Sequence, residues 1–168
     1  EIECRLVSGK DIVKEMERTA DDKGLDGLIA GGGDGTISAA AGIAWKHKIT
    51  LGVVPAGTMN LFARSLKLPL DIWQAVDTLA QGHVENVDIA TANGQPFVHQ
   101  FSAGLHARMV RYRDKMEYAS RLGKMRANVR AALGVVLNPP VFDMEFTVDG
   151  KTQHRRVCAI SASNNEFG

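Results

Sequence analysis

Residues 25–37 read LDGLIAGGGDGTI, and this stretch decides the fold class. The apolar run from Leu25 to Ala30 is typical of a buried strand, and an Ala-rich segment with helical spacing follows at residues 37–46. A strand, a glycine-rich bend and a helix in this order indicate a parallel sheet layered with helices. Because glycine has no Cβ, we expect the bend at residues 31–35 to allow positive φ angles and close approach of a ligand to its N–H groups.

The same alternation of strands and helices continues on both sides of this stretch. A strand is predicted at residues 49–54, followed by a bend at residues 55–58 and a short helix. Trp45 and Trp73 occupy apolar positions of predicted helices, so we expect both in the core. The remaining predicted elements are a strand with alternating Ile2, Cys4 and Leu6, a helix that Ser8 or Asp11 begins, and a helix at residues 72–80 that Asp71 caps.

The pattern changes near residue 84 and predicts antiparallel pairing. Asn93-Gly94 separates strands expected at residues 84–92 and 95–101, and Asp149-Gly150 separates strands expected at 141–148 and 152–163. Such dipeptides between apolar runs are the strongest short hairpin signals. A basic helical insertion is expected at residues 105–137.

Composition excludes several classes of protein. The chain has 168 residues, of which 45% are apolar and 23% are charged, and this balance excludes a disordered chain. Its longest apolar stretches fall far short of the ~20 residues that a membrane helix needs. The two Cys and five His residues show no metal-ligand or disulfide spacing, so we expect no metal held by this chain alone and a reducing, cytoplasmic setting.

The glycine-rich bend has the physical properties of a phosphate site. Close backbone approach combines there with the partial positive charge of a helix N-terminus. Neither Gly-Lys-Ser/Thr nor Gly-x-Gly-x-x-Gly is present, which excludes the common phosphate templates. Asp34 is unusual in an anion site, and it favours phosphoryl chemistry in which Mg²⁺ bridges the charges or a proton is taken. The alternative is a tight turn in which Asp34 caps the following helix.

A second bend repeats this arrangement after the next strand. Residues 53–64 read VVPAGTMNLFAR, in which Gly57 permits close approach and Thr58 and Asn60 offer hydrogen bonds. Ligands of parallel α/β sheets lie beyond the carboxyl ends of the strands, so both bends are expected to converge on one ligand. The alternative is that Pro55 and Gly57 only shape a turn and that Asn60 caps a helix.

These two motifs resemble a known family. Residues 32–36, Gly-Gly-Asp-Gly-Thr, resemble the signature of diacylglycerol, sphingosine and NAD kinases and, more loosely, of phosphofructokinases. Residues 55–64 resemble a stretch of the diacylglycerol kinase catalytic domain that NAD kinases lack. Asp88 and residues 101–105 also match the family's sequence leading into its second domain.

The resemblance implies an ATP-dependent lipid kinase that transfers the γ-phosphate to the hydroxyl of a diacylglycerol-like lipid. It implies a Rossmann-like, three-layer nucleotide domain at residues 1–85, an antiparallel β-sandwich domain at residues 86–168, and ATP with Mg²⁺ between them. Asp34 would be the catalytic residue. The residues expected around ATP are Gly32, Gly33, Asp34, Gly35, Thr36, Ile37, Ser38, Gly57, Thr58 and Asn60.

The chain also departs from this family. From the resemblance, we expect the chain to enter after the family's first strand and to end before two acidic segments that in the family hold a metal and the general base. We therefore expect a truncated catalytic domain that does not turn over by itself. Two alternatives are a catalytically silent nucleotide- or lipid-binding module and, less favoured by residues 55–64, an NAD kinase.

Charge is unevenly distributed and indicates different partners for the two halves. Residues 1–90 hold 9 basic and 13 acidic side chains, whereas residues 91–168 hold 11 basic and 6 acidic ones. Because basic clusters with interleaved apolar residues bind anionic lipid, we expect peripheral contact with a membrane and no nucleic acid. The residues proposed for this contact are Arg108, Arg111, Arg113, Arg121 and Lys124.

Overall fold

The computed structural model describes residues 2–22, 24–105, 139 and 141–164. The chain divides into two compact units, one formed by Glu1–Gln100 with Ser163–Gly168 and the other by Phe101–Ala162. The boundary of the functional domains expected at residues 85 and 86 stays a prediction.

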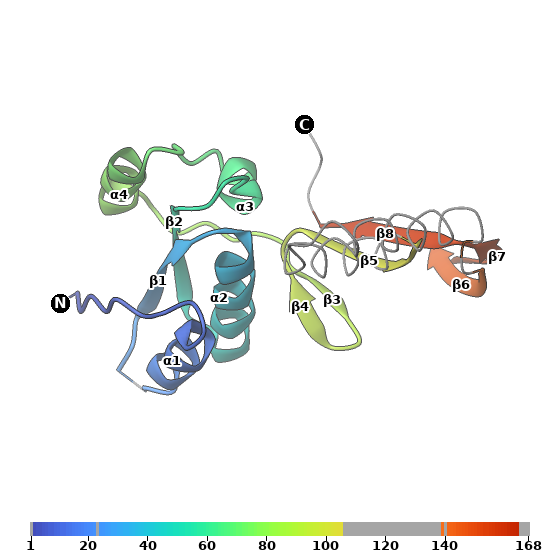
Figure 1. The fold of residues 1–168 in the computed structure, drawn as a ribbon, viewed down its shortest axis with the longest axis horizontal. Helices are drawn as coiled ribbons and strands as arrows, with labels where there is room; N and C mark the ends of the chain where they lie inside the picture. Colours follow the sequence, from blue (N-terminus) through green and yellow to red (C-terminus); the bar gives the residue numbers. More distant parts are fainter. Residues whose placement is uncertain (1, 23, 106–138, 140, 165–168) are drawn as a thin grey trace, which may run out of the picture. The chain divides into compact units, whose positions relative to one another are not determined.

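A parallel pair of strands lies at the centre of the first unit. Strands β1 (Gly27–Gly32) and β2 (Thr50–Pro55) pair in register from Gly27 opposite Thr50 to Gly32 opposite Pro55. Figure 1 shows α1 (Ile12–Ala20) and α2 (Asp34–His47) on one side of this pair and α3 (Leu61–Ser65) and α4 (Ile72–Gln81) on the other. The predicted α/β class is therefore confirmed.

Small side chains on α2 let this helix pack closely on the strands. Ala40 is fully buried, and Ala41 and Ala44 are nearly so. Ala40 and Ala41 lie in the same core as Val53 of β2 and Val98, both 2% exposed. This packing fixes the first turn of α2 relative to the carboxyl ends of β1 and β2.

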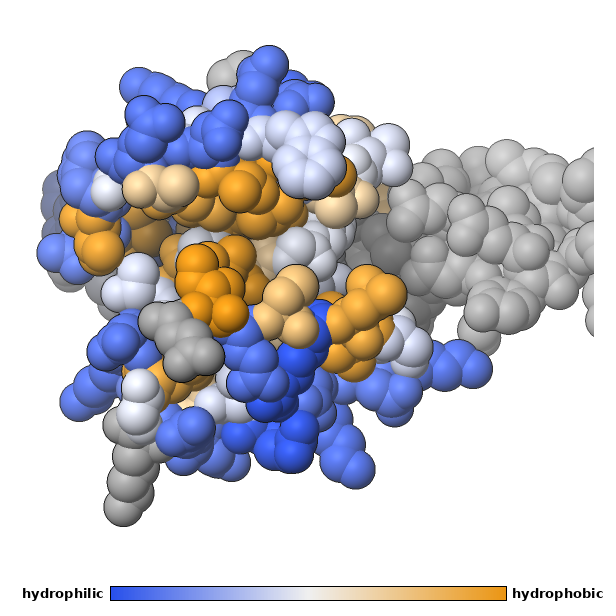
Figure 2. Space-filling view, turned by 90° about the vertical axis from the view of Figure 1, so that its left-hand side faces the viewer, coloured by the Kyte–Doolittle hydropathy of each residue, from blue (hydrophilic) through white to orange (hydrophobic). Residues whose placement is uncertain are grey.

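Two expectations about the first unit are wrong. Residues 2–7 form no strand, because no strand among the described residues lies beside them to supply backbone partners. Trp45 and Trp73 are 49% and 78% exposed, so neither belongs to the core. Figure 2 shows that hydrophobic side chains also lie on the surface of this unit among polar ones.

Helix boundaries differ slightly from those predicted. Helix α2 begins at Asp34 rather than at residue 37, because β1 continues through Gly32 and leaves Gly33 as the only connecting residue. The predicted cap of α4 is confirmed, since the Asp71 side chain accepts a hydrogen bond of 3.0 Å from the N–H of Gln74.

The first predicted hairpin forms with shorter strands. Strands β3 (Ala90–Ala92) and β4 (Gln95–Phe97) pair antiparallel, and Asn93 and Gly94 have φ angles of 51° and 76°. Positive φ at both central residues is the requirement of the tight hairpin turn. Strand β3 begins at residue 90 instead of 84, and β4 packs against α2.

The second unit contains the other predicted hairpin. Strands β6 (Phe142–Val148) and β7 (Lys151–Val157) pair antiparallel around Asp149 and Gly150, both at positive φ. Strands β5 (Gln100–Gly104) and β8 (Ala159–Ser163) form a second pair. The predicted insertion at 105–137 lies almost entirely outside the described residues. Within those residues, no helix has the length and apolar character to cross a bilayer.

Candidate functional site

The two glycine-containing bends lie directly against each other at the carboxyl ends of β1 and β2. The Gly32 carbonyl accepts a hydrogen bond of 3.0 Å from the N–H of Ala56. A Cβ on Gly57 would lie only 2.4 Å from the Cα of Gly33. The predicted meeting of the two bends is thus present in the fold. It requires glycine at position 57, whereas a Cβ on Gly33 would stay 3.4 Å from the Cα of Gly57.

The reason for glycine here is space rather than backbone conformation. Gly33, the N-cap of α2, has a φ of −83°, and the described glycines with positive φ are Gly94, Gly104 and Gly150. The expectation of positive φ in the bend is therefore wrong. A Cβ on Gly32 would lie 2.7 Å from the Thr36 side chain, so close packing excludes a larger residue at this position.

Asp34 connects the two bends through its side chain. Its Oδ1 accepts a hydrogen bond of 2.6 Å from the N–H of Leu61, and its Oδ2 accepts one of 3.1 Å from the N–H of Asn60. Asp34 therefore caps α3, which is 27 residues away in the sequence, and not α2, whose N-cap is Gly33. Two amides at a helix N-terminus are a favourable environment for a carboxylate.

Asn60 shapes the second bend from within. It is 8% exposed and has a left-handed φ of 51°, a conformation that asparagine tolerates better than most residues. Its Oδ1 accepts from the N–H of Gly57, and its Nδ2 donates to the carbonyl of Gly57, both at 2.9 Å. Asn60 occupies the N-cap position of α3, but its side chain makes no hydrogen bond to the N–H groups of that helix. Its side-chain amide closes the bend instead.

The remaining predicted residues divide into accessible and buried ones. A Cβ on Gly35 would meet no atom within 4 Å, and Thr58 is exposed. Thr36 and Ser38 are half-buried, whereas Ile37 is 4% exposed and belongs to the core. The first N–H groups of an α-helix have no partner within the helix, and those of α2 begin at Asp34, beside the open space at Gly35. This arrangement suits an anion.

Sequence reasoning missed one residue of this site, His99. The side chain of His99 is 16% exposed, and its Nε2 lies 3.6 Å from Oδ1 of Asp34. Its ring also meets Phe62 of α3 edge-on, with centroids 6.0 Å apart. The spacing of the histidines in the sequence does not predict this contact, because only the fold brings residue 99 beside residue 34.

Among the predicted site residues, Asp34 is the one with a carboxylate, which could bind Mg²⁺. The described residues contain no group of three His, Cys, Asp or Glu side chains able to hold a metal. Mg²⁺ in nucleotide sites is held by one or two carboxylates together with substrate phosphates. One carboxylate beside a helix N-terminus is compatible with that mode and not with a metal held by protein groups alone.

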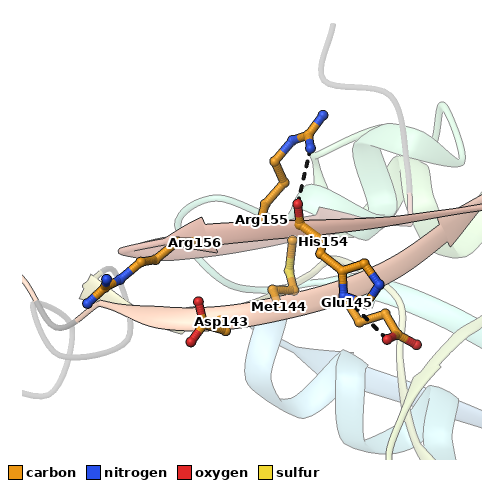
Figure 3. A pocket seen from close by; sticks show the side chains of 6 residues that line it. All are labelled: Asp143, Met144, Glu145, His154, Arg155 and Arg156. Atoms are coloured by element: carbon orange, nitrogen blue, oxygen red, sulfur yellow. Dashed lines mark hydrogen bonds and ion pairs between the residues drawn. The ribbon is translucent and has the colours of Figure 1, made fainter.

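A separate shallow pocket of about 340 Å³ lies on the β6–β7 hairpin and contains none of the predicted site residues. Figure 3 shows its six lining side chains, and His154 reaches Glu145 across the strands at 3.5 Å. Asp143 and Arg156 occupy paired positions in the two strands. The acidic and basic side chains of this pocket thus pair with each other across an exposed hairpin, which is typical of a structural role.

Comparison with known proteins identifies the family. Residues 1–92 match the family model described as the diacylglycerol kinase catalytic domain, so the chain belongs to this family. It is 40% identical over 115 residues to a diacylglycerol kinase of Staphylococcus aureus, covering 67% of this chain and 36% of that protein. It is 32% identical over 158 residues to the uncharacterized protein sll0036 of Synechocystis sp., covering 92% of this chain and 36% of that protein.

A solved structure gives the same fold. The chain resembles the crystal structure of a diacylglycerol kinase from Bacillus anthracis with a TM-score of 0.66 at 24% identity, over 98% of this chain and 53% of that one. The chain thus spans about a third of these curated relatives and about half of that solved structure.

Proposed function

We propose that this chain is part of the catalytic domain of an ATP-dependent lipid kinase, which transfers the γ-phosphate of ATP to a lipid hydroxyl. The main support for this proposal is that Asp34 joins the two bends through hydrogen bonds, in a chain of the diacylglycerol kinase catalytic domain family. Phosphoryl transfer depends mainly on positioning and charge stabilisation, and two adjoining bends with free amides can supply both.

Individual residues receive distinct roles in this proposal. The N–H groups at the start of α2, near Gly35 and Thr36, bind phosphate oxygens, and the Thr58 hydroxyl reaches the same anion from the second bend. Gly32, Gly33 and Gly57 provide the space for this arrangement. Asn60 holds the second bend in shape, and Ile37 supports the site from the core. Ser38 is half-buried on α2.

Asp34 orients the bends and offers negative charge to Mg²⁺ on the ATP phosphates. Both of its oxygens already accept a backbone N–H, and each retains a lone pair. This geometry suits a positioning and metal-facing carboxylate better than a base that takes the proton of the acceptor hydroxyl.

A transfer assay tests this function. The full-length protein is incubated with γ-³²P-ATP, Mg²⁺ and, in turn, diacylglycerol, phosphatidylglycerol, sphingosine and ceramide, and in a separate incubation with NAD. We expect label in the product of one of these lipids, with a diacylglycerol-like acceptor first. Label in none of them, with ATP bound, would favour the silent module, and label transferred to NAD would favour an NAD kinase.

Peripheral membrane contact at the cytoplasmic face is the second part of the proposal. Its basic residues, Arg108, Arg111, Arg113, Arg121 and Lys124, lie outside the described residues, so the proposal rests on their charge and spacing in the sequence. Reversing the charge of Arg111, Arg113 and Arg121 should weaken sedimentation with phosphatidylglycerol vesicles and flatten its salt dependence. Unchanged sedimentation would refute the membrane contact.

A further inference from the structure

His99 stands out because its buried polar atoms lack partners next to a charged group. Both ring nitrogens are buried, and neither makes a hydrogen bond with a described residue. Buried polar atoms in native proteins nearly always have a partner, and each exception requires an explanation. The Oδ1 atom of Asp34, 3.6 Å from Nε2, is the acceptor that the structure places beside this ring.

The backbone holds His99 firmly in this position. Its carbonyl accepts a hydrogen bond of 2.9 Å from the N–H of Asn164, and Asn164 also donates its side-chain Nδ2 to the Asp88 carbonyl at 2.8 Å. The preceding residue, Val98, lies in the core at 2% exposure. On the other side, the edge-on contact with Phe62 limits rotation of the ring. The imidazole is therefore presented to Asp34 by a fixed segment.

The Oδ1 atom of Asp34 has the capacity for one more donor. Each carboxylate oxygen can accept two hydrogen bonds, and Oδ1 and Oδ2 each accept one backbone N–H. A shift of less than 1 Å would bring Nε2–H to the distance of a charge-assisted hydrogen bond. This bond would also oppose the repulsion between the Asp34 carboxylate and an anion bound at α2.

We propose that His99 is a positioning residue for Asp34, donating Nε2–H to Oδ1 and fixing the orientation of the carboxylate between the two bends. The catalytic part of this inference rests on the proposed kinase function, whereas the contact itself does not. His99 acts through Asp34 and is not assigned a contact with the substrate.

Two substitutions separate hydrogen bonding from packing. His99→Phe keeps a ring beside Phe62 and removes the donor, whereas His99→Gln keeps an N–H donor and removes the ring. In the full-length protein we expect kcat of His99→Phe to fall by about tenfold, as for loss of a hydrogen bond to a charged group, with a smaller change in the KM for ATP. His99→Gln should retain a kcat within about threefold of the wild type. A kcat of His99→Phe equal to or above that of His99→Gln would overturn the positioning role.

A double-mutant cycle tests the contact without any assumption about activity. The unfolding equilibria of wild type, His99→Phe, Asp34→Ala and the double variant are measured by urea denaturation. A direct contact predicts a coupling of about threefold or more in the unfolding constant, and independent effects would contradict the contact. A wild type that transfers no phosphate and binds no ATP, with this coupling present, would refute the kinase function and leave the contact standing.

Discussion

The Asp34 carboxylate and the backbone N–H of Leu61 are joined by a hydrogen bond of 2.6 Å between residues 27 positions apart. Together with the bond from the Asn60 N–H, it ties the start of α2 to the start of α3. Both helices follow strands of the same parallel sheet. The residue that sequence motifs single out for chemistry is thus also the residue that assembles the site.

Asp34→Asn is expected to reduce stability as well as activity. Its amide NH2 would face the N–H of either Leu61 or Asn60, leaving a donor without an acceptor at a cost of about 1–3 kcal/mol. Urea denaturation measures the loss of stability, and the lipid kinase assay measures the loss of activity. Asp26→Asn is the matched control, because Asp26 is exposed and makes no side-chain hydrogen bond or ion pair with the described residues. Equal stability of the two variants would contradict the bridging role.

Gly57→Ala should destabilise the protein through a clash between the two bends. The added Cβ would lie 2.4 Å from the Cα of Gly33, and a backbone atom cannot move aside as a flexible side chain can. We expect a loss of about 1–3 kcal/mol, the usual cost of overpacking, measured by chemical denaturation. A variant as stable as the wild type would show that the bends are not in contact.

Gly35→Ala should have the opposite effect on stability and still impair ligand binding. Its Cβ meets no protein atom within 4 Å, and alanine favours the helix by about 0.5–1 kcal/mol over glycine. The same Cβ would occupy the space through which phosphate oxygens approach the amides of α2. Titration with a fluorescent ATP analogue should show an affinity lower by about tenfold, as for one lost charge-assisted hydrogen bond. Unchanged affinity would place the phosphates elsewhere.

Acid should weaken the attachment of the N-terminal segment to α1. Hydrogen bonds from Arg18 and Arg5 lower the pKa of Glu15 to about 2. Because the folded-state pKa is below the ordinary value of 4.5, the contribution to stability is complete above that value and is lost as the pH falls toward 2. The difference in thermal stability between wild type and Glu15→Gln should shrink over this interval. The control is Glu17→Gln, because the Glu17 side chain has no partner among the described residues. Its difference in thermal stability from the wild type should not change over this pH range.

Local chemistry explains which parts of the fold the sequence predicts correctly. Asn93-Gly94 and Asp149-Gly150 define their turns because few other residues accept positive φ at both positions. Asp71 begins α4 because its side chain accepts the N–H of Gln74. These features depend on neighbouring residues alone, so a single sequence contains them.

The failures concern contacts between distant segments. The alternation at residues 2–6 satisfies the strand pattern, yet a strand also requires a neighbour, which the described residues do not supply. Trp73 occupies an apolar position on α4, but nothing in the helical pattern indicates whether another element covers that face. His99 lies beside Asp34 because of tertiary packing, which no local sequence pattern indicates.

The candidate site shows the same division. The two glycine motifs indicate correctly that the bends follow strands β1 and β2 and meet. The reason for glycine differs, because the bends require close packing at Gly32 and Gly57 rather than positive φ. The binding of Asp34 to the α3 amides also depends on the parallel register, which a linear motif does not contain.

The most direct measurement is a crystal structure of the full-length protein with Mg²⁺ and a non-hydrolysable ATP analogue. We expect phosphate oxygens within hydrogen-bonding distance of the backbone N–H groups at the start of α2 and of the Thr58 hydroxyl, with Asp34 still hydrogen-bonded to the N–H groups of Asn60 and Leu61. A triphosphate bound away from these two bends, or bends that separate when the nucleotide binds, would contradict this expectation.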